Sequence, residues 1–414
     1  MQLSQQIKIN PTNEQTKVLW NLSERCRLCY NFALTERMEN WKENKDKPKE
    51  ERTYIDYEKQ QNDLPSIKEK YEEYKWVYSK VLQYTLKTLD ADYKSFFSLW
   101  KKGDANAHPP KYKGKKYFTT MVYNQSGFKC YNNKIGLSHK YDKTSLEFDI
   151  PEKFKFSKIY QISIYQKNND FYVSVTYEKE EKPYIDNGLY QAFDLGVTKQ
   201  TAVNIHGKFK EFKNKRPDKY WEKRIEEVQA KRDHCKRYSR KWSFYNKSLK
   251  YMKRKSANQL RDFQHKLSRK IVDNTKSNTI IVGDLSVKDM SKKSNKIENL
   301  SKKANKSIHR SMQNTGTIGR FVKYLTYKSE IVGKKTIDIC ERGTSKTCCC
   351  CGKQHDMPLT KRIMECDCGN VIDRDKNSSI NIMLRFLSQN GLWAAYQQFV
   401  GNLRQTGILI GIHS

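Results

Sequence analysis

The spacing of hydrophobic residues changes several times along the chain, and each change predicts a different kind of structural element. Residues 1–10 alternate in hydrophobicity in the manner of a strand. Thr12 and Gln15 then form a capping-box signature, and the helical period that follows is clearest between residues 82 and 100. We therefore expect residues 11–106 to be a helical region.

A period of two returns between Tyr117 and Tyr177, where turn residues separate the alternating segments. This pattern predicts an antiparallel β unit, which the strand at the start of the chain could complete. Lys111 and Lys113 lie in the joint between the helical and the β region. They could hold a nucleic-acid backbone, although a solvated linker explains them nearly as well.

The second half of the chain follows a polar linker at 180–187 and alternates strands with helices. Two strands are expected in QAFDLGVTKQTAVNIHG, the first of which carries Asp194. A basic helical stretch with interleaved aromatic residues spans 219–274, and a buried strand is expected at 279–285. A further helix, a strand at 335–340 and a last amphipathic helix complete an α+β pattern.

Two segments of this half show no regular pattern. The stretch 288–310 is rich in Lys, Ser and Asn, and we expect it to become ordered on nucleic acid. Lys288 and Arg310 within it are candidate nucleic-acid contacts. The final residues, 392–414, carry no chemistry that we can interpret from the sequence.

The charge of the chain indicates its partner. Of the 414 residues, 80 are Lys or Arg and 46 are Asp or Glu, so the formal charge is +34. Such an excess suits a polyanion, and tyrosines set among lysines suit stacking on bases. A lysine-rich composition inherited from an AT-rich genome explains part of the lysine content but not the surplus of positive charge. Nucleic acid is therefore the leading partner, ahead of a membrane surface, and no apolar run reaches transmembrane length.

Six of the eleven cysteines gather in two short groups, CCCC and CDC, late in the chain. Their spacing is typical of a zinc ribbon, in which two knuckles close a tetrahedral thiolate site. In the first group we choose the outer pair as ligands, because Gly352 then follows that pair as Gly369 follows the second pair. The expected zinc ligands are Cys348, Cys351, Cys366 and Cys368.

Disulfides are the alternative use of these cysteines. The segment MQLSQQIKIN is polar and unlike a secretory signal, so we expect the reducing environment of the cytoplasm, where disulfides are rare. A structural zinc is therefore favoured. The other cysteines are expected to be ordinary buried thiols: Cys26, Cys29, Cys130, Cys235 and Cys340.

Acidic residues on the expected strands indicate a second metal site. Asp194 lies in an apolar strand, where an isolated carboxylate is costly to bury unless it binds something. Asp375 lies at the start of the last helix, and Asp373 beside it is expected to act as a cap or to support the site. The order of the elements is that of an RNase H-like nuclease, in which about three carboxylates hold two Mg²⁺ ions for phosphodiester hydrolysis.

Several segments resemble the transposon-encoded TnpB family, which is related to the miniature type V CRISPR effectors. They are FDLGV, GDLSVKDM, YKSEIVGKK, ERGTSKTCCCCG and CDCGNVIDRDKNSSINI, and the resemblance spans most of the chain. In the commonest family pattern a Glu precedes the Asp-Leu of the middle strand, where this chain has Gly283. Some TnpB-like proteins and the related eukaryotic Fanzors instead carry this carboxylate on the neighbouring strand, at the position that Glu341 has here.

Two residues therefore compete for the role of second carboxylate. Asp284 is adjacent to Gly283, but the period of a strand turns its side chain to the opposite face of the sheet. Glu341 directly follows the strand at 335–340, which should end near the same metal pair. We favour Glu341 and keep Asp284 as the alternative, so that the expected catalytic and Mg²⁺-binding residues are Asp194, Glu341 and Asp375.

The resemblance implies an RNA-guided DNA endonuclease of a transposon, in which a guide RNA from the transposon end selects double-stranded target DNA beside a short motif. A monomer is expected. The implied regions are a wedge β barrel at 1–10 and 107–183, a helical recognition domain at 11–106, a RuvC nuclease domain at 186–343 and 371–414, and a zinc-binding target-loading module at 344–370.

Three alternatives stay open at this point. A nuclease-dead, guide-directed repressor would bind its target without cutting it, and a miniature type V CRISPR effector would differ mainly in its genomic neighbourhood. A transposase proper would join DNA ends without RNA, but the sequence shows no Tyr–His arrangement for single-strand transposition.

Overall fold

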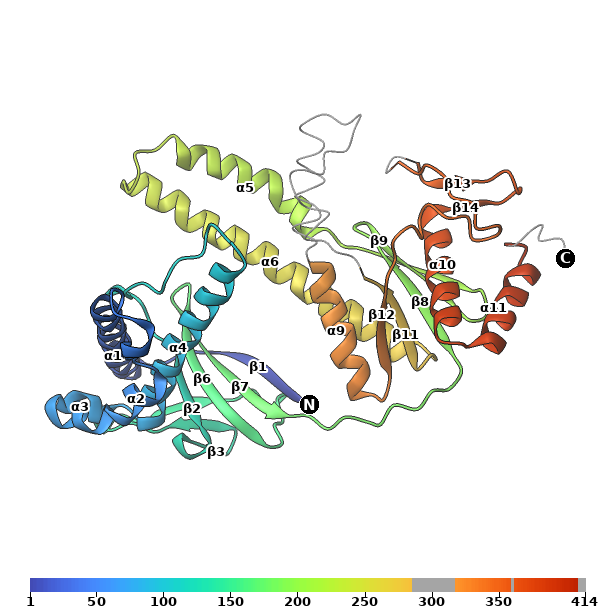
Figure 1. Cartoon of the computed structure of the whole chain (residues 1–414). Helices are drawn as coiled ribbons and strands as arrows, with labels where there is room; N and C mark the ends of the chain where they lie inside the picture. The colour runs from blue at the N-terminus through green and yellow to red at the C-terminus, as the bar shows by residue number, and fades with distance from the viewer. Residues whose placement is uncertain (285–316, 359–360, 409–414) are drawn as a thin grey trace. The chain divides into compact units, whose positions relative to one another are not determined.

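The computed structural model describes residues 1–284, 317–358 and 361–408, which divide into two compact units between Glu180 and Glu181 (Figure 1). Lys288 and Arg310, two of the expected nucleic-acid contacts, lie outside the described residues. No helix in the described part of the chain is long and apolar enough to cross a membrane.

The N-terminal unit contains two antiparallel sheets. The first strand, β1 (Gln2–Ile9), pairs with β7 (Asp170–Glu178), so the start of the chain completes the β unit as its pattern predicted. The sheet orders are β1-β7-β6-β2 and β3-β4-β5, and residues of both sheets contribute to one hydrophobic core. The remaining strands are β2 (Met121–Asn124), β3 (Phe128–Tyr131), β4 (Lys134–Leu137), β5 (Leu146–Asp149) and β6 (Ile159–Lys167).

The helices of this unit lie between β1 and β2, where the helical period predicted them. The first, α1 (Asn13–Asn44), begins at the expected capping box: the Gln15 amide donates to Thr12 Oγ1 at 3.2 Å, and the Thr12 amide donates to Gln15 Oε1 at 3.1 Å. Leucines of α4 (Ser79–Lys101) are buried in the shared core. The shorter helices between these strands are η1 (Lys49–Glu51), α2 (Tyr57–Asn62), α3 (Leu64–Lys70) and η2 (Glu72–Trp76), and one further turn, η3 (Gln125–Gly127), follows β2.

The C-terminal unit is built on a five-stranded sheet of order β10-β9-β8-β11-β12. Its central strand, β8, is parallel to β11, which is in turn parallel to β12, whereas β9 and β10 extend the sheet as an antiparallel hairpin. The strands are β8 (Tyr190–Leu195), β9 (Lys199–Asn204), β10 (Phe209–Lys213), β11 (Thr279–Gly283) and β12 (Lys335–Ile339). Parallel neighbours end at the same edge of the sheet, and residues just beyond those ends therefore lie close together.

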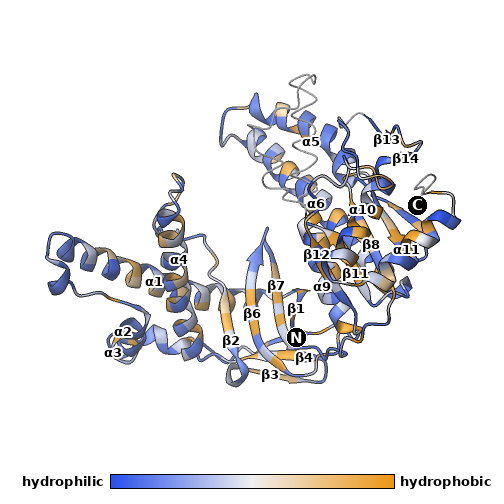
Figure 2. Ribbon diagram, turned by 45° about the vertical axis from the view of Figure 1, so that its right-hand side comes forward, coloured by the Kyte–Doolittle hydropathy of each residue, from blue (hydrophilic) through white to orange (hydrophobic). Residues whose placement is uncertain are grey.

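Helices cover both faces of this sheet, so its strands are hydrophobic on both sides (Figures 1 and 2). Alternate strand residues serve the two cores: Ala192 and Ile281 face α10 and α11, whereas Phe193 and Val282 face α6 and α9. The helices are α5 (Pro217–Asp233), α6 (Arg240–Asn274), α9 (Thr317–Ile331), α10 (Arg374–Gln389) and α11 (Trp393–Gln405), and a small hairpin of β13 (Ile363–Glu365) and β14 (Val371–Asp373) precedes α10.

Two expectations need correction. Helix α11 forms within residues 392–414, for which no chemistry was interpreted and no element predicted, and it buries Phe399 and Leu403 in the core of the sheet face that α10 covers. All eleven cysteines lie in the described part of the chain and are free, but not all the isolated ones are buried. Cys130 and Cys340 are exposed because they lie in or next to strands at sheet edges, and Cys235 is half-buried, whereas Cys26 and Cys29 are buried as predicted.

Candidate functional site

The four cysteines expected to bind zinc come together around one point. Their Sγ atoms all lie within 4.8 Å of one another, with 3.7 Å between Cys348 and Cys368 and 3.5 Å between Cys351 and Cys366. Zn–S bonds of about 2.3 Å in a tetrahedron place the sulfur atoms about 3.8 Å apart. The cluster therefore fits a structural zinc ion, and the outer pair of the CCCC group supplies two of its ligands.

The surroundings of the cluster support the same assignment. Gly352 and Gly369 follow the two knuckles with φ of +75° and +84°, the left-handed conformation that favours glycine. The Asn370 side-chain amide donates to Cys348 Sγ at 3.2 Å, and His355 Nε2 lies 3.1 Å from Cys366 Sγ. Such contacts orient thiolate ligands. The two cysteines between the ligands of the first knuckle, Cys349 and Cys350, are buried in the core instead.

Two asparagines of α10 attach the first knuckle to this helix. The Asn377 and Asn381 side-chain amides each donate to the carbonyl oxygens of Thr344 and Thr347, at 2.7–3.2 Å. The Cys349 amide donates to Asn377 Oδ1 at 2.9 Å, and Asn377 is fully buried. The zinc cluster is therefore fixed to the helix that also carries Asp375.

Asp194 and Asp375 lie on the same face of the sheet. Asp194, next to the last residue of β8, has the same parity as Ala192 and faces the side covered by α10. Asp375 lies in the first turn of α10, which Asp373 caps: Asp373 Oδ1 accepts the amides of Asp375 and Lys376 at 2.9 and 3.1 Å. Asp373 is thus the N-cap of α10, which is one of the two roles predicted for it.

Glu341 occupies space that the glycine of β11 leaves open. A Cβ atom added to Gly283 would lie 1.9 Å from Glu341 Oε2 and 3.0 Å from Glu341 Cβ, so no side chain fits at 283 while Glu341 keeps this position. Gly283 has the parity of Ile281 and Glu341 that of Ile339, and both of these isoleucines belong to the core under α10. The Glu341 carboxylate therefore lies where a side chain on the middle strand would otherwise project.

Asp284 has a different environment. Its amide continues the β11–β12 ladder by donating to Ile339 O at 2.7 Å, and the residue is exposed. By alternation its side chain belongs to the other face of the sheet. Its charge acts on Glu341 and on Asp338, whose pKa is raised by burial and then by Asp284.

The electrostatics couple the three favoured carboxylates. Burial, followed by the charges of Asp375 and Glu341, raises the pKa of Asp194 to about 8. Burial, followed by the charge of Asp284, raises the pKa of Glu341 to about 7. Two neighbouring acids with raised pKa values, Asp194 and Glu341, are typical of a functional site and would be relieved by a bound cation.

The donor set fits hard divalent cations. Glu341 Oε2 is buried and accepts no hydrogen bond from any residue in the described ranges, and the same holds for the hydroxyl of Thr201, which pairs with Asp194 across β8 and β9. Unpaired carboxylate oxygens are the ligands that Mg²⁺ prefers. Within the described residues only the cysteines bring three or more ligating atoms within 4.8 Å of one another, so the three carboxylates do not form so tight a cluster.

Sequence reasoning did not single out Lys199. Its ammonium lies 2.8 Å from Glu211 Oε1 and 3.5 and 3.6 Å from carboxylate oxygens of Asp373 and Asp375. Burial is the largest single influence on the pKa of Lys199 and lowers it, but Glu211, Asp373 and Asp375 together raise it by more, so the net shift is upward. The signal was its place at the start of the strand that pairs with β8.

The two expected nucleic-acid contacts of the N-terminal unit differ. Lys111 is exposed. The ammonium of Lys113 lies 3.4 Å from the centre of the Tyr30 ring, and its carbonyl oxygen accepts from Arg27 and Asn31. Lys113 is therefore engaged in the packing of this unit, which makes Lys111 the better placed of the two for a phosphate.

Three family models match the chain. A "Helix-turn-helix domain" model of the IS605 OrfB proteins matches residues 1–46, the IS605 OrfB model described as "Probable transposase" matches 173–294, and a "Cas12f1-like, TNB domain" model matches 319–382. The third match includes Glu341, the four clustered cysteines and Asp375.

Several individual proteins are also similar to this chain in sequence or in structure. A Streptomyces pristinaespiralis protein named "Putative RNA-guided DNA endonuclease" is 26% identical over 90% of this chain and 86% of its own length. The TnpB-like protein L79 of Acanthamoeba polyphaga mimivirus is 32% identical over 33% of this chain, but the match spans only a quarter of that protein. Among solved structures, the protein of a Cas12f1–sgRNA–target DNA complex has the same overall fold, with a TM-score of 0.56 and 14% identity over 90% of this chain and 83% of that one.

Proposed function

We propose that this chain is a member of the TnpB family and an RNA-guided DNA endonuclease that cleaves guide-complementary DNA beside a short motif. The observation that carries the proposal is the set of buried, electrostatically coupled carboxylates at one edge of the five-stranded sheet. A charge of +34 suits the RNA and DNA that such an enzyme must hold together.

The regions are assigned on the same basis. Residues 1–10 and 107–183 would form the wedge, whose strands build the two antiparallel sheets, and 11–106 the recognition helices. The RuvC nuclease would comprise 186–343 and 371–414, with Asp194 in β8, Glu341 just after β12 and Asp375 in the first turn of α10. The zinc cluster lies within 344–370, the proposed target-loading module.

The acids have distinct roles in this proposal. Asp194, Glu341 and Asp375 would hold two Mg²⁺ ions, which supply an activated water and stabilise the leaving oxygen of the DNA strand. Asp194 is the central residue, because the charges of both other acids act on it. The Ser378 hydroxyl donates to Thr344 Oγ1 at 3.0 Å, and the Thr344 hydroxyl in turn donates to the Glu341 carbonyl at 2.8 Å. This chain of hydroxyl groups joins α10 to the turn after Glu341.

The placement of the second carboxylate is tested by two isosteric variants. Glu341→Gln and Asp284→Asn each remove one charge from neighbouring positions without changing volume. With guide RNA, Mg²⁺ and a plasmid that carries the matched target, Glu341→Gln should lower the cleavage rate by more than about 100-fold, the upper end of what residues that merely support a metal contribute. Asp284→Asn should cut at close to the parent rate, and both should bind RNA as the parent does.

The opposite order, with Asp284→Asn inactive and Glu341→Gln active, would show that the second carboxylate is wrongly placed. Target binding without cutting by the parent chain at any Mg²⁺ concentration would refute the nuclease itself and leave a guided DNA-binding repressor.

A further inference from the structure

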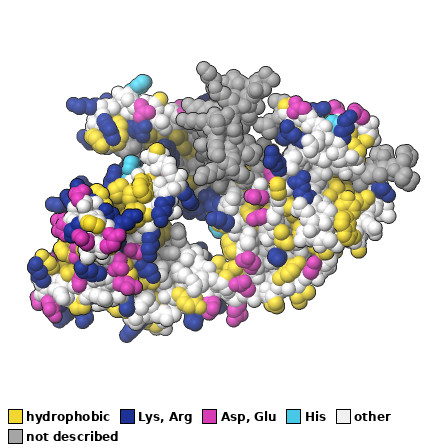
Figure 3. All heavy atoms as spheres, in the orientation of Figure 1, with side chains coloured by type: hydrophobic (Ala, Val, Ile, Leu, Met, Phe, Trp, Pro, Cys, Tyr) yellow, Lys and Arg dark blue, Asp and Glu magenta, His cyan; other side chains and the backbone are white. Residues whose placement is uncertain are grey.

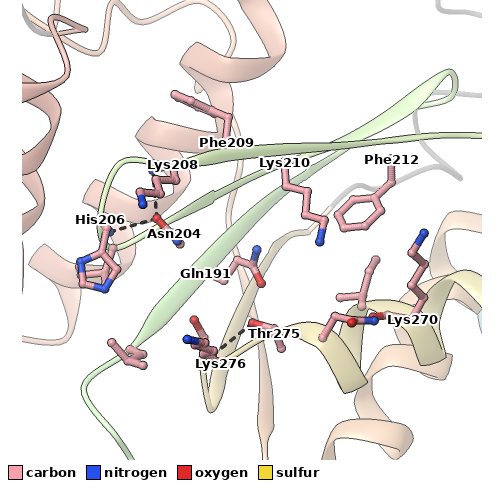
Figure 4. A pocket seen from close by; sticks show the side chains of 15 residues that line it. Gln191, Asn204, His206, Lys208, Phe209, Lys210, Phe212, Lys270, Thr275 and Lys276 are labelled. Atoms are coloured by element: carbon pink, nitrogen blue, oxygen red, sulfur yellow. Dashed lines mark hydrogen bonds between the residues drawn. The ribbon is translucent and has the colours of Figure 1, made fainter.

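A pocket of about 310 Å³ lies in the C-terminal unit, at the end of the sheet opposite the carboxylates (Figure 4). The start of β8, the turn between β9 and β10, and the last turn of α6 form its walls. The volume is at the lower end of that of small-molecule sites, so it suits one unit of a flexible strand and not a duplex.

The lining of the pocket carries one sign of charge. No Asp or Glu is found among the described residues that form its walls. The basic residues that line it are His206, Lys208, Lys210, Lys270 and Lys276. Lys210 and Lys270 approach it from opposite sides, from β10 and α6 (Figure 4). A concave site with four lysines and no counter-charge attracts phosphate.

The C-terminal end of α6 would normally oppose an anion, because its free carbonyl groups carry partial negative charge. Here the Lys334 ammonium neutralises these carbonyl groups. It donates to the carbonyl oxygens of Val272 and Thr275, at 2.8 and 2.5 Å. The Asn274 side chain donates to a third carbonyl, that of Lys270, at 2.7 Å. The helix end is thus neutralised, and the positive charge of the lining is not cancelled.

The floor of the pocket offers an acceptor without a donor. Gln191 has the parity of Phe193 and therefore faces the α6 side of the sheet, and its side chain lies in the middle of the pocket (Figure 4). Its Oε1 atom is buried and accepts no hydrogen bond from the described residues. A buried acceptor of this kind needs a donor from outside these residues, and a ligand in the pocket can supply one.

The walls are held in place before any ligand arrives. Asn204 Oδ1 accepts the amides of His206 and Lys208 at 3.1 and 3.0 Å and so shapes the turn between β9 and β10. The Asn187 side chain donates to the Lys276 carbonyl at 2.9 Å and accepts the amide of Asn278 at 3.1 Å. A preformed site loses less conformational entropy on binding.

From these observations we infer that the pocket binds one nucleotide of a single-stranded RNA segment, with its phosphate on Lys210 and Lys270 and a ribose 2′-hydroxyl on Gln191 Oε1. The lysines alone would accept DNA as readily as RNA. The unpaired Gln191 acceptor would favour RNA over DNA, because the 2′-hydroxyl is a hydrogen-bond donor that RNA has and DNA lacks. The inference rests on the proposed function in one respect: the RNA would be part of the guide transcript.

The contact is tested with the full chain, a short single-stranded RNA that contains 4-thiouridine, and the DNA strand of the same sequence. Photocrosslinking followed by mass spectrometry should locate RNA on the peptides that contain Lys210 and Lys270. Lys210→Ala/Lys270→Ala should remove these crosslinks and lower the slope of log affinity against log salt by about 1.4, or about 0.7 for each lost phosphate contact on a single strand. Lys253→Ala/Lys266→Ala removes the same charge from exposed positions of α6 outside the pocket, and it should leave the pocket crosslinks unchanged.

Selection of RNA is tested separately with Gln191→Met, which keeps the side-chain volume and removes the acceptor. The affinity of the RNA for the pocket, measured by competition against the crosslink, should fall about fivefold, the effect of one hydrogen bond, with no change for DNA. The melting temperature should not fall, because the lost acceptor has no partner in the free protein.

Absence of crosslinks from the pocket peptides of the parent chain would overturn the inference. So would an equal loss of RNA and DNA affinity in Gln191→Met, which would leave a site for any phosphate backbone. Neither outcome depends on cutting, so a chain that binds RNA here but never cleaves DNA would refute the proposed nuclease and not this contact.

Discussion

Replacing Asp194 by Asn should stabilise the Mg²⁺-free protein, and the gain should grow as the pH rises. The pKa of Asp194 is about 8 in the folded chain, against an ordinary value of 3.8. Between these two values the unfolded chain is ionised and the folded chain holds the proton. Folding must then take up a proton, so the free energy of unfolding falls by about 1.4 kcal/mol for each pH unit.

The size of the effect follows from the interval between the ordinary pKa of Asp194 and the pH of the experiment. At pH 5 the ionisation of Asp194 lowers the free energy of unfolding by about 1.6 kcal/mol, and at pH 7 by about 4 kcal/mol, both as upper bounds. Asn has nearly the same shape and no charge, so it removes this loss at every pH. One kcal/mol corresponds to about 2–4 °C in a unit of this size, so Asn should raise the melting temperature by roughly 10 °C at pH 7 and by much less at pH 5.

Thermal unfolding in Mg²⁺-free buffer measures this directly, without chelator so that zinc stays in place. Asp284→Asn is the comparison variant: Asp284 is an exposed carboxylate near the same edge of the sheet, and its removal should give a smaller gain, because its charge adds to the raised pKa of Glu341 and of Asp338 only after burial. Added Mg²⁺ should stabilise the parent at pH 7 and do little for Asp194→Asn. A variant that gains the same amount at pH 5 and pH 7, or that loses stability, would contradict the assignment of Asp194 as a buried acid awaiting cations.

Two further changes test the parts around the carboxylates. Gly283→Ala should lower the cleavage rate far more than the stability, because the added Cβ would lie 1.9 Å from the flexible end of Glu341 and displace this carboxylate. The displacement should cost about 1–3 kcal/mol of stability, which thermal melting measures separately from the cleavage rate. Cleavage at the parent rate would mean that Glu341 need not lie there. Cys366→Ser should release zinc, as metal analysis would show, and should reduce cutting, because Asn377 joins the cluster to α10. A zinc-free variant that cuts at the parent rate would show that the cluster does not support the site.

Much of the fold could be predicted because local patterns and long-range packing agree. The capping box at Thr12 gives the start of α1, and the alternation around Asp194 and Ile281 gives two strands covered on both faces. Helix α11 was not predicted because its buried residues, Phe399 and Leu403, stand among small and polar neighbours that blur the helical period. Cys130 and Cys340 were misjudged because exposure depends on which strand lies at a sheet edge, and single-strand patterns do not contain strand order.

The site divides in the same way. Cysteine spacing alone was enough for the zinc cluster, since a short knuckle brings its own ligands together. The carboxylates come from segments far apart in sequence, and alternation favoured Glu341 over Asp284 only because the strand containing each was identified first. Lys199 and Gln191 carry no motif, and their surroundings depend on neighbours in the folded sheet.

The steric relation between Gly283 and Glu341 shows how the ends of two neighbouring strands can present a carboxylate to the same space without a change of fold. β11 and β12 are parallel neighbours, so their C-terminal ends lie at one edge, and a long side chain just after one strand reaches the space above the end of the other. The space holds one side chain, because a Cβ at 283 and the Glu341 carboxylate exclude each other. Glycine at 283 is therefore required by Glu341 and not by backbone conformation, since Gly283 has no positive φ. It follows that Gly283→Glu should be tolerated only when Glu341 is shortened. Gly283→Glu/Glu341→Gly should then cut better than either single variant, whereas a double variant no better than Glu341→Gly would show that the two positions do not serve the same ions.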